Sequence, residues 1–181
     1  HKEEENLVVR TAVKNLSSCY AGKEVVQIYV SAPWGRLEKP YQELKAWEKT
    51  KLLAPGESQQ LTLTIPLDQL SSYDEESASY LLEAGTYYIR VGNSSRNTHI
   101  AGSLLVPSPV ICAQYSNCLG LKPCNRNKLA FLSAQNISPI TYPGEEQEKQ
   151  VPPSFLITQE DITVRHPQKQ TVPAQAEPKP S

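Results

Sequence analysis

Hydrophobic and polar residues alternate in short runs along the first hundred positions of this chain. Over residues 7–14, Leu7 and Val9 lie on one side of an extended chain, and Arg10 and Lys14 lie on the other. A period of two rich in β-branched residues predicts half-buried strands. Similar runs predict extended segments over residues 24–32, 43–53, 59–65, 79–82, 85–92 and 99–106.

Two of these segments depart from simple alternation. Residues 24–32 carry apolar side chains on both faces, because Val25 and Tyr29 accompany Val26 and Ile28. We therefore predict a central strand that is covered on both sides. Within residues 43–53, the spacing of Leu44, Trp47 and Lys51 would also suit a helix. We predict an extended segment, because a long helix fits poorly between two strands in so short a span.

Turn signals separate the predicted strands. Residues 33–40 begin and end with proline, which donates no hydrogen bond to a sheet, so we expect an exposed loop. Pro55 and Gly56 are placed for a type II turn over residues 54–57. Residues 67–74 are expected to contain a single helical turn.

About seven short strands with such turns predict an all-β fold, an immunoglobulin- or fibronectin type III-like antiparallel β-sandwich with a largely irregular C-terminal tail. Residues 82–88, with the sequence LEAGTYY, resemble the tyrosine corner at the entry to a late sandwich strand. The pattern leaves open which tyrosine forms the corner.

Proline usage divides the chain. Only four of its 15 prolines lie before residue 67, and the others all follow residue 106. We therefore predict a sandwich domain over residues 1–106 and a Pro-rich linker or extension over residues 107–181 that is partly disordered. Within this extension, only residues 155–157 and 162–164 are expected to pack or pair.

Charge and hydropathy argue against two classes of partner. The net charge is −1, and lysines alternate with glutamates rather than forming a basic stripe, so we expect no nucleic-acid partner. No apolar run approaches the roughly 20 residues that span a bilayer, so we expect no membrane partner. The first residues enter a strand-like pattern almost at once, and no methionine is present. We expect the chain to be cut from a longer one.

Candidate chemistry is sparse. Cys112, Cys118 and Cys124 lack the paired spacing of zinc sites, and both a disulfide and free thiols stay open for them. The acidic clusters are adjacent residues in turns, whereas glycoside chemistry needs two carboxyl groups across a cleft. We therefore predict no catalytic, cofactor-binding or metal-binding residue in this chain.

Aromatic residues offer a possible binding surface. Trp34, Tyr41 and Trp47 could form a platform for carbohydrate, because ring faces stack on sugars. In the other interpretation, which we favour, Trp34 caps a loop while Trp47 packs in the sandwich or under a neighbouring domain. Three triplets, at Asn15, Asn93 and Asn136, match the glycosylation acceptor pattern.

Two long motifs resemble a known module. They are AGKEVVQIYV over residues 21–30 and LEKPYQELKAWEK over residues 37–49, and shorter matches follow within residues 53–58, 70–74 and 83–87. Together they resemble the fibronectin type III-like domain of glycoside hydrolase family 3, which includes many β-glucosidases.

The resemblance implies a role and no active site. In that family the catalytic residues lie in other domains, so no catalytic residue is carried over. It implies a non-catalytic accessory domain that packs on and stabilises the catalytic domains of the same parent chain, a glycoside hydrolase of the β-glucosidase type that hydrolyses O-glycosyl bonds. The predicted interdomain contact residues are Trp34, Tyr41, Leu44 and Trp47.

Two alternatives accompany this interpretation. The chain is either such an accessory domain or an independent sandwich that binds carbohydrate or protein through the loop around Trp34. The residues that follow the sandwich resemble the connector of permuted family members, in which the catalytic barrel follows this module. We therefore hypothesise a permuted domain order for the parent protein.

Overall fold

The computed structural model describes residues 2–3, 5–116 and 155–166, and this part of the chain is built almost entirely from strands. No α-helix occurs among the described residues, which contain eleven strands and two 3₁₀ turns. The strands are β1 (Lys2–Glu3), β2 (Asn6–Lys14), β3 (Val25–Ser31), β4 (Glu43–Lys49), β5 (Ser58–Pro66), β6 (Ser72–Asp74), β7 (Ser79–Leu82), β8 (Gly85–Ser94), β9 (Asn97–Val106), β10 (Val110–Gln114) and β11 (Phe155–Leu156). The 3₁₀ turns are η1 (Leu67–Leu70) and η3 (Gln159–Asp161).

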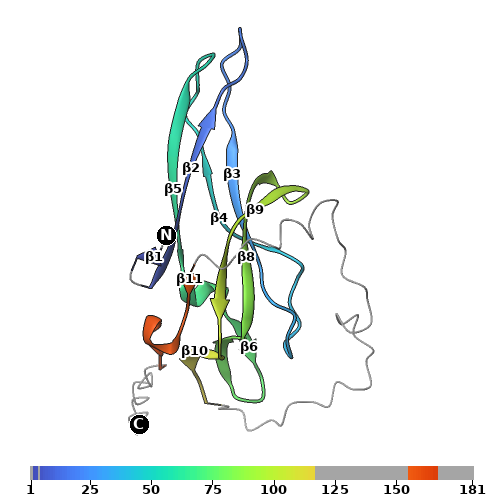
Figure 1. The fold of residues 1–181 in the computed structure, drawn as a ribbon, viewed down its shortest axis with the longest axis vertical. Helices are drawn as coiled ribbons and strands as arrows, with labels where there is room; N and C mark the ends of the chain where they lie inside the picture. The colour runs from blue at the N-terminus through green and yellow to red at the C-terminus, as the bar shows by residue number, and fades with distance from the viewer. Residues whose placement is uncertain (1, 4, 117–154, 167–181) are drawn as a thin grey trace, which may run out of the picture.

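The strands form a sandwich with a small additional sheet at one end. β2 and β5 pair antiparallel along their whole length, with β1 beside β2. They face a five-stranded sheet in the order β11-β9-β8-β3-β4, and a third sheet has the order β10-β7-β6. In Figure 1 the β2–β5 pair and the connections beside it rise to a narrow tip, while β6 and β10 lie at the opposite end.

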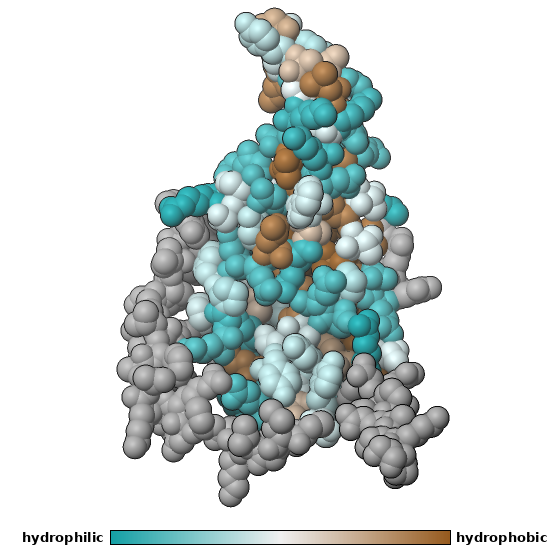
Figure 2. Space-filling view, turned by 180° about the vertical axis from the view of Figure 1, so that it is seen from behind, coloured by the Kyte–Doolittle hydropathy of each residue, from teal (hydrophilic) through white to brown (hydrophobic). Residues whose placement is uncertain are grey.

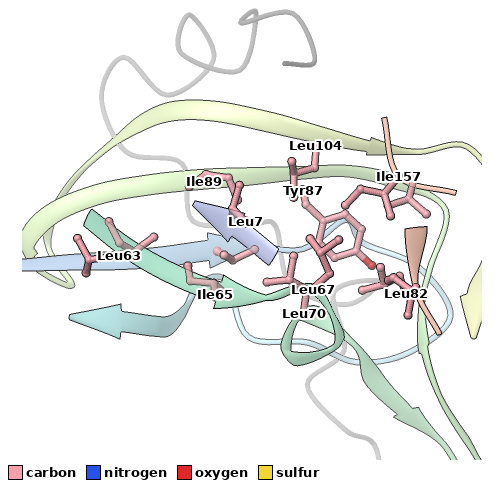
Figure 3. Packing of buried hydrophobic residues seen from close by; sticks show 14 of the residues in the cluster. Leu7, Leu63, Ile65, Leu67, Leu70, Leu82, Tyr87, Ile89, Leu104 and Ile157 are labelled. Carbon is pink, nitrogen blue, oxygen red and sulfur yellow. The ribbon is translucent and has the colours of Figure 1, made fainter. Parts of the chain in front are cut away.

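One hydrophobic cluster fills the space between the sheets. Its members alternate along each strand, as they must when one face of a strand is buried. β5 contributes Leu61, Leu63 and Ile65, and β3 contributes Val26 and Ile28. Figure 3 shows these layers meeting around Tyr87, with side chains from η1 and β7 below it. The predicted all-β sandwich is therefore confirmed.

The two ambiguous segments also follow the prediction. β3 is a central strand, because it pairs with β8 along one edge and with β4 along the other. Tyr29 on its outer face is buried as Ile28 is on the inner face, whereas Val25 and Gln27 on the outer face are half-buried. Residues 43–49 are extended as β4 rather than helical. Gly56 has φ of 77°, the left-handed conformation that the third position of a type II turn requires. The helical turn expected within residues 67–74 is η1.

The structure also identifies the residue of the tyrosine corner. Tyr87 is fully buried at the start of β8, and its hydroxyl donates a 3.2 Å hydrogen bond to the backbone oxygen of Glu83. Burial raises the pKa of this phenol, so the hydroxyl stays protonated and keeps donating. The corner fixes the entry of β8 into the core.

The predicted domain boundary after residue 106 does not coincide with the end of the packed sandwich. β10 pairs with β7 beyond it, and its Val110 and Cys112 side chains lie in the core. Loss of alternation suggested the boundary, but a five-residue strand with a register shift leaves little periodic signal. Residues 117–154 and 167–181 of the predicted extension lie outside the described residues, as do Cys118 and Cys124.

Residues 155–166, which we call the closing segment, return to the sandwich. β11 pairs in parallel with β9, and the Ile157 backbone N–H donates to the oxygen of Leu105 at 2.9 Å. Ile157 and Ile162 are buried in the core, and Thr163 donates to the Glu5 carboxylate from its backbone and its hydroxyl. The packing expected for residues 155–157 and for Ile162 is confirmed.

We expect the closing segment to contribute substantially to stability. Ile157 is 0% exposed and lies beside Tyr87 in Figure 3. Ile157→Ala should therefore lower the free energy of unfolding by about 3 kcal/mol, through lost burial and a residual cavity. Urea denaturation of the 181-residue chain measures this. The matched control is Leu156→Ala, because Leu156 is 54% exposed and its loss should cost under about 1 kcal/mol. Equal losses in the two variants would contradict the packing role.

Candidate interdomain docking surface

Two of the four predicted contact residues share one exposed face of the five-stranded sheet. In the pairing of β4 with β3, Leu44 lies opposite Tyr29 and Trp47 lies opposite Gln27. Gln27 and Tyr29 are alternate residues of β3 and point to the same side. A register shift in the pairing inserts one extra residue into β4, so Leu44 and Trp47, although three residues apart, both lie on that side, away from the core. Trp47 is 64% exposed, so it does not pack in the sandwich within the described part of the chain. The other alternative given for it, packing under a neighbouring domain, stays a prediction.

The other two predicted residues have different environments. Trp34 is half-exposed in the loop that follows β3. Tyr41 is turned against Arg90, whose guanidinium lies 5.2 Å from the centre of the ring and donates to the phenol oxygen at 2.9 Å. Arg90 is itself buried and donates to Ser31. Tyr41 therefore covers a buried cation, and in the described residues Trp34 and Trp47 make no ring contact with each other or with Tyr41.

The loop over residues 33–41 is held by one carboxylate. Glu83 accepts hydrogen bonds from the backbone N–H of Arg36 at 2.7 Å and of Leu37 at 3.2 Å, and it pairs with the ammonium of Lys39. A Cβ at Gly35 would lie 2.5 Å from the same carboxylate, so a side chain at this position would require the Glu83 carboxylate to shift relative to these partners. Burial alone would raise the pKa of Glu83, but Lys39 and these N–H groups together lower it.

A second ion pair ties this loop to the small sheet. Arg36 Nη2 lies 2.6 Å from Oδ2 of Asp74, a buried carboxylate that also accepts from the Ser77 hydroxyl at 2.6 Å. The hydrogen bond from Arg36 is the main cause that lowers the pKa of Asp74 to about 2. The loop is therefore positioned by charge-assisted bonds rather than by apolar burial.

A second exposed apolar area, which the sequence did not predict, lies at the tip of the molecule. Leu16 is 86% exposed and Tyr20 is 76% exposed in the β2–β3 connection, and Leu52 in the β4–β5 connection is also exposed. Backbone hydrogen bonds between Gly22 and Leu53, at 2.8 and 3.0 Å, hold these connections side by side. Figure 2 shows apolar surface at this narrow end. We call Leu16, Tyr20 and Leu52 the apolar tip.

Asn15 fixes the conformation of the apolar tip. Its side-chain amide donates to the backbone oxygens of Tyr20 and Leu53, at 2.8 and 2.9 Å, and its side-chain oxygen accepts from Ser17 N–H. Its backbone also pairs with residues of the neighbouring turn. A rigid, exposed apolar surface is typical of a protein contact.

One feature of the sequence could have indicated the tip. Asn15 begins the segment NLSSCY, in which an asparagine and serines supply turn bonds around an isolated leucine and tyrosine. Turn residues are normally polar. Apolar residues inside a turn with many hydrogen bonds therefore indicate an exposed surface that contacts another protein or domain. The sequence alone did not bring Leu52 next to them, because that requires the pairing of Gly22 with Leu53.

The described residues offer little for catalysis. Glu5, Glu57, Asp74 and Glu83 all have a lowered pKa, whereas the acid of a glycosidase needs a raised one. Burial raises the pKa of the Cys112 thiol to about 11, which keeps it protonated and unreactive at neutral pH. No group of three or more possible metal ligands occurs within the described ranges. The same residues include no helix long and apolar enough to cross a membrane.

Comparison with known proteins identifies the domain. Residues 24–95 match the family described as fibronectin type III-like domain. The chain is 39% identical over 118 residues to β-glucosidase A of Butyrivibrio fibrisolvens, which covers 62% of this chain and 14% of that protein. It is 34% identical over 142 residues to a β-glucosidase of Ruminococcus albus, covering 76% of this chain and 15% of that one. The structure resembles that of a β-glucosidase from Paenibacillus barengoltzii with a TM-score of 0.58 and 41% identity, over 61% of this chain and 13% of that one.

The fold and these matches define a fibronectin type III-like domain. It is the domain of this class found in family 3 β-glucosidases, as its long motifs indicated. The chain spans about one seventh of the length of these relatives, 14% and 15% in the two compared by sequence.

The Arg36–Asp74 pair predicts a pH dependence of stability. The pKa of Asp74 is lowered from 3.8 to about 2, so its contribution is fully present above pH 4 and is lost as the pH falls toward 2. Since Arg36 is half-exposed, we expect this contribution to be about 1–2 kcal/mol. Urea denaturation at several pH values between 5 and 2 measures this. The free energy of unfolding of the native chain should fall over this range by about 1–2 kcal/mol more than that of Asp74→Asn.

The control for this measurement is Glu38→Gln in the same loop. Glu38 is exposed and makes no ion pair with any described residue. Its profile should follow that of the native chain, in which Glu83 and other carboxylates still titrate. If the free energy of unfolding changed equally with pH in Asp74→Asn and in the native chain, the Arg36–Asp74 pair would not contribute to stability.

Proposed function

We propose that this chain is a non-catalytic accessory domain of a larger β-glucosidase-like glycoside hydrolase, and that it packs on and stabilises the catalytic domains of the same parent chain. The observation that carries the proposal is a rigid apolar surface on a domain that matches one seventh of its relatives' length. Exposed side chains of this size are commonly buried at protein contacts.

The proposed contact has two parts. The apolar tip offers Leu16, Tyr20 and Leu52, and the outer face of β4 offers Leu44 and Trp47. Burying such side chains contributes roughly 1.5–3 kcal/mol each when they become fully covered. Little of this is lost to ordering, because the Asn15 bonds already hold the tip in one conformation. Trp34 and Tyr41 would lie at the edge of the contact rather than in its centre.

This proposal predicts that the isolated 181-residue chain hydrolyses no aryl β-glucoside. The carboxylates with lowered pKa values are ion-pair or hydrogen-bond partners, which hold no proton to give at neutral pH. The measurement is release of nitrophenol from a p-nitrophenyl β-glucoside over hours. Turnover that persists after repurification would place catalysis inside this chain and contradict the proposal.

The docking role is tested in the protein encoded by the complete reading frame around these residues. Leu16→Ser combined with Tyr20→Ser should lower its melting temperature by several degrees, because the apolar contact is lost. Its kcat/KM for an aryl β-glucoside, measured well below the melting temperature, should change by less than about twofold. In the isolated 181-residue chain the same double variant should be nearly neutral, since both side chains are exposed there.

The matched control is Ile111→Ser, an exposed apolar residue of the small sheet at the other end of the domain. It should lower the melting temperature of the whole protein by no more than it lowers that of the isolated 181-residue chain. Hydrogen exchange gives a second readout, because the backbone around the apolar tip should be protected more strongly in the whole protein. No effect of the double variant on either readout would reject docking through the tip.

A further inference from the structure

A pocket of about 310 Å³ opens at the end of the sandwich opposite the apolar tip. Its walls come from η1, β7, β10 and the closing segment, which lie far apart in the sequence. The lining includes Asp68, Ser71, Tyr80, Cys112, Tyr115 and Arg165. Its volume is at the lower end of the range for small-molecule sites. None of these residues belongs to the proposed docking surface.

Tyrosine rings form one wall of this pocket. The Tyr80 ring packs against Tyr73 with 5.1 Å between centroids, and against Tyr115 with 5.9 Å in an edge-on arrangement. All three rings are about two-fifths exposed, so they support one another while part of each faces solvent. Ring contacts of this kind hold aromatic surface in one orientation without burying it.

A charged pair forms the other side of the pocket. Arg165 Nη1 lies 2.8 Å from Oδ2 of Asp68. The Arg165 backbone is fixed on both sides, since its N–H donates to Cys112 and its oxygen accepts from Gln114, both at 2.9 Å. The backbone oxygen of Asp68 accepts from Ser71. The pocket therefore presents donors and acceptors on backbone that is already ordered.

The charges of the pocket favour a neutral ligand. Asp68 already neutralises Arg165, so an anion would have to compete with a carboxylate at 2.8 Å. A lone carboxylate already paired to a guanidinium is also a poor cation site. The Cys112 thiol adds no charge, because burial raises its pKa to about 11. An uncharged molecule with an apolar face and several hydroxyl groups matches both walls.

We propose that this pocket binds one pyranose ring of a neutral oligosaccharide. The C–H face of the sugar packs on Tyr80 and Tyr115, its hydroxyls donate to Asp68, and its oxygens accept from Arg165. The site lies away from the platform of Trp34, Tyr41 and Trp47 considered from the sequence. It goes beyond the docking role and does not depend on it, because it uses other residues at the other end of the domain.

The test is titration of the 181-residue chain with cellotetraose. Binding is measured by isothermal titration calorimetry and, separately, by the chemical shifts of the backbone amides. We expect a Kd on the order of 1 mM, typical of a small open site. Tyr80→Ala should weaken binding at least about tenfold, whereas Tyr80→Phe keeps the ring and should stay within about twofold. Asp68→Asn should weaken binding through the polar wall without changing the rings.

The matched control is Trp47→Ala, which removes an exposed ring from the other face and should leave the affinity unchanged. If Tyr80→Ala does not fold, Tyr115→Ala and Asp68→Asn carry the test. The proposal is overturned if the native chain binds no cellotetraose, if Trp47→Ala abolishes binding, or if Tyr80→Ala binds normally. If the chain bound no cellotetraose but the apolar tip still stabilised the parent protein, the sugar-binding proposal would be rejected and the docking proposal would stand.

Discussion

The core is closed by burial of Ile157 and Ile162, whereas the other buried core members among the described residues all precede residue 113. Without them, Tyr87 and Leu104 would face solvent on one side, and the edge of β9 would lose its parallel partner. The same segment delivers Arg165 to Asp68 and thereby completes the pocket. A short stretch of chain therefore closes the core and builds a surface site at once, which links the stability of the domain to the geometry of that site.

Charge-assisted bonds and apolar burial have separate tasks in this molecule. The sandwich is held by apolar burial, whereas the 33–41 loop is held by Glu83 and Asp74 through Lys39 and Arg36. A loop that contains two prolines cannot join a sheet, and it has too few apolar residues to build a core of its own. Ion pairs with the buried Asp74 and the partly buried Glu83 fix the position of this loop without sheet pairing and without an apolar core. The apolar tip uses a third means, in which the amide of Asn15 replaces missing sheet bonds.

Much of the sandwich could be predicted because its determinants are local. Alternation places Leu61, Leu63 and Ile65 on one face, and Gly56 specifies its turn without help from distant residues. The contributions that were missed all depend on pairing across long stretches of chain. Neither the burial of Val110 nor the pairing of Gly22 with Leu53, which brings the two connections of the apolar tip together, leaves a periodic signal. The contact of Tyr41 with Arg90 also could not be predicted from the sequence, because the two residues are 49 positions apart and the sheet determines that Arg90 is buried.

The positions of the two exposed surfaces bear on how they could work together. The apolar tip and the tyrosine pocket lie at opposite ends of the long axis of the domain (Figure 1). A partner domain that covers the tip would leave the pocket open, so docking and sugar binding need not compete. Their chemistry also differs, since one surface is apolar and rigid while the other combines rings with a neutralised ion pair. A domain anchored at one end and binding at the other would hold an oligosaccharide away from its partner domain, at a separation set by the paired strands between the two ends.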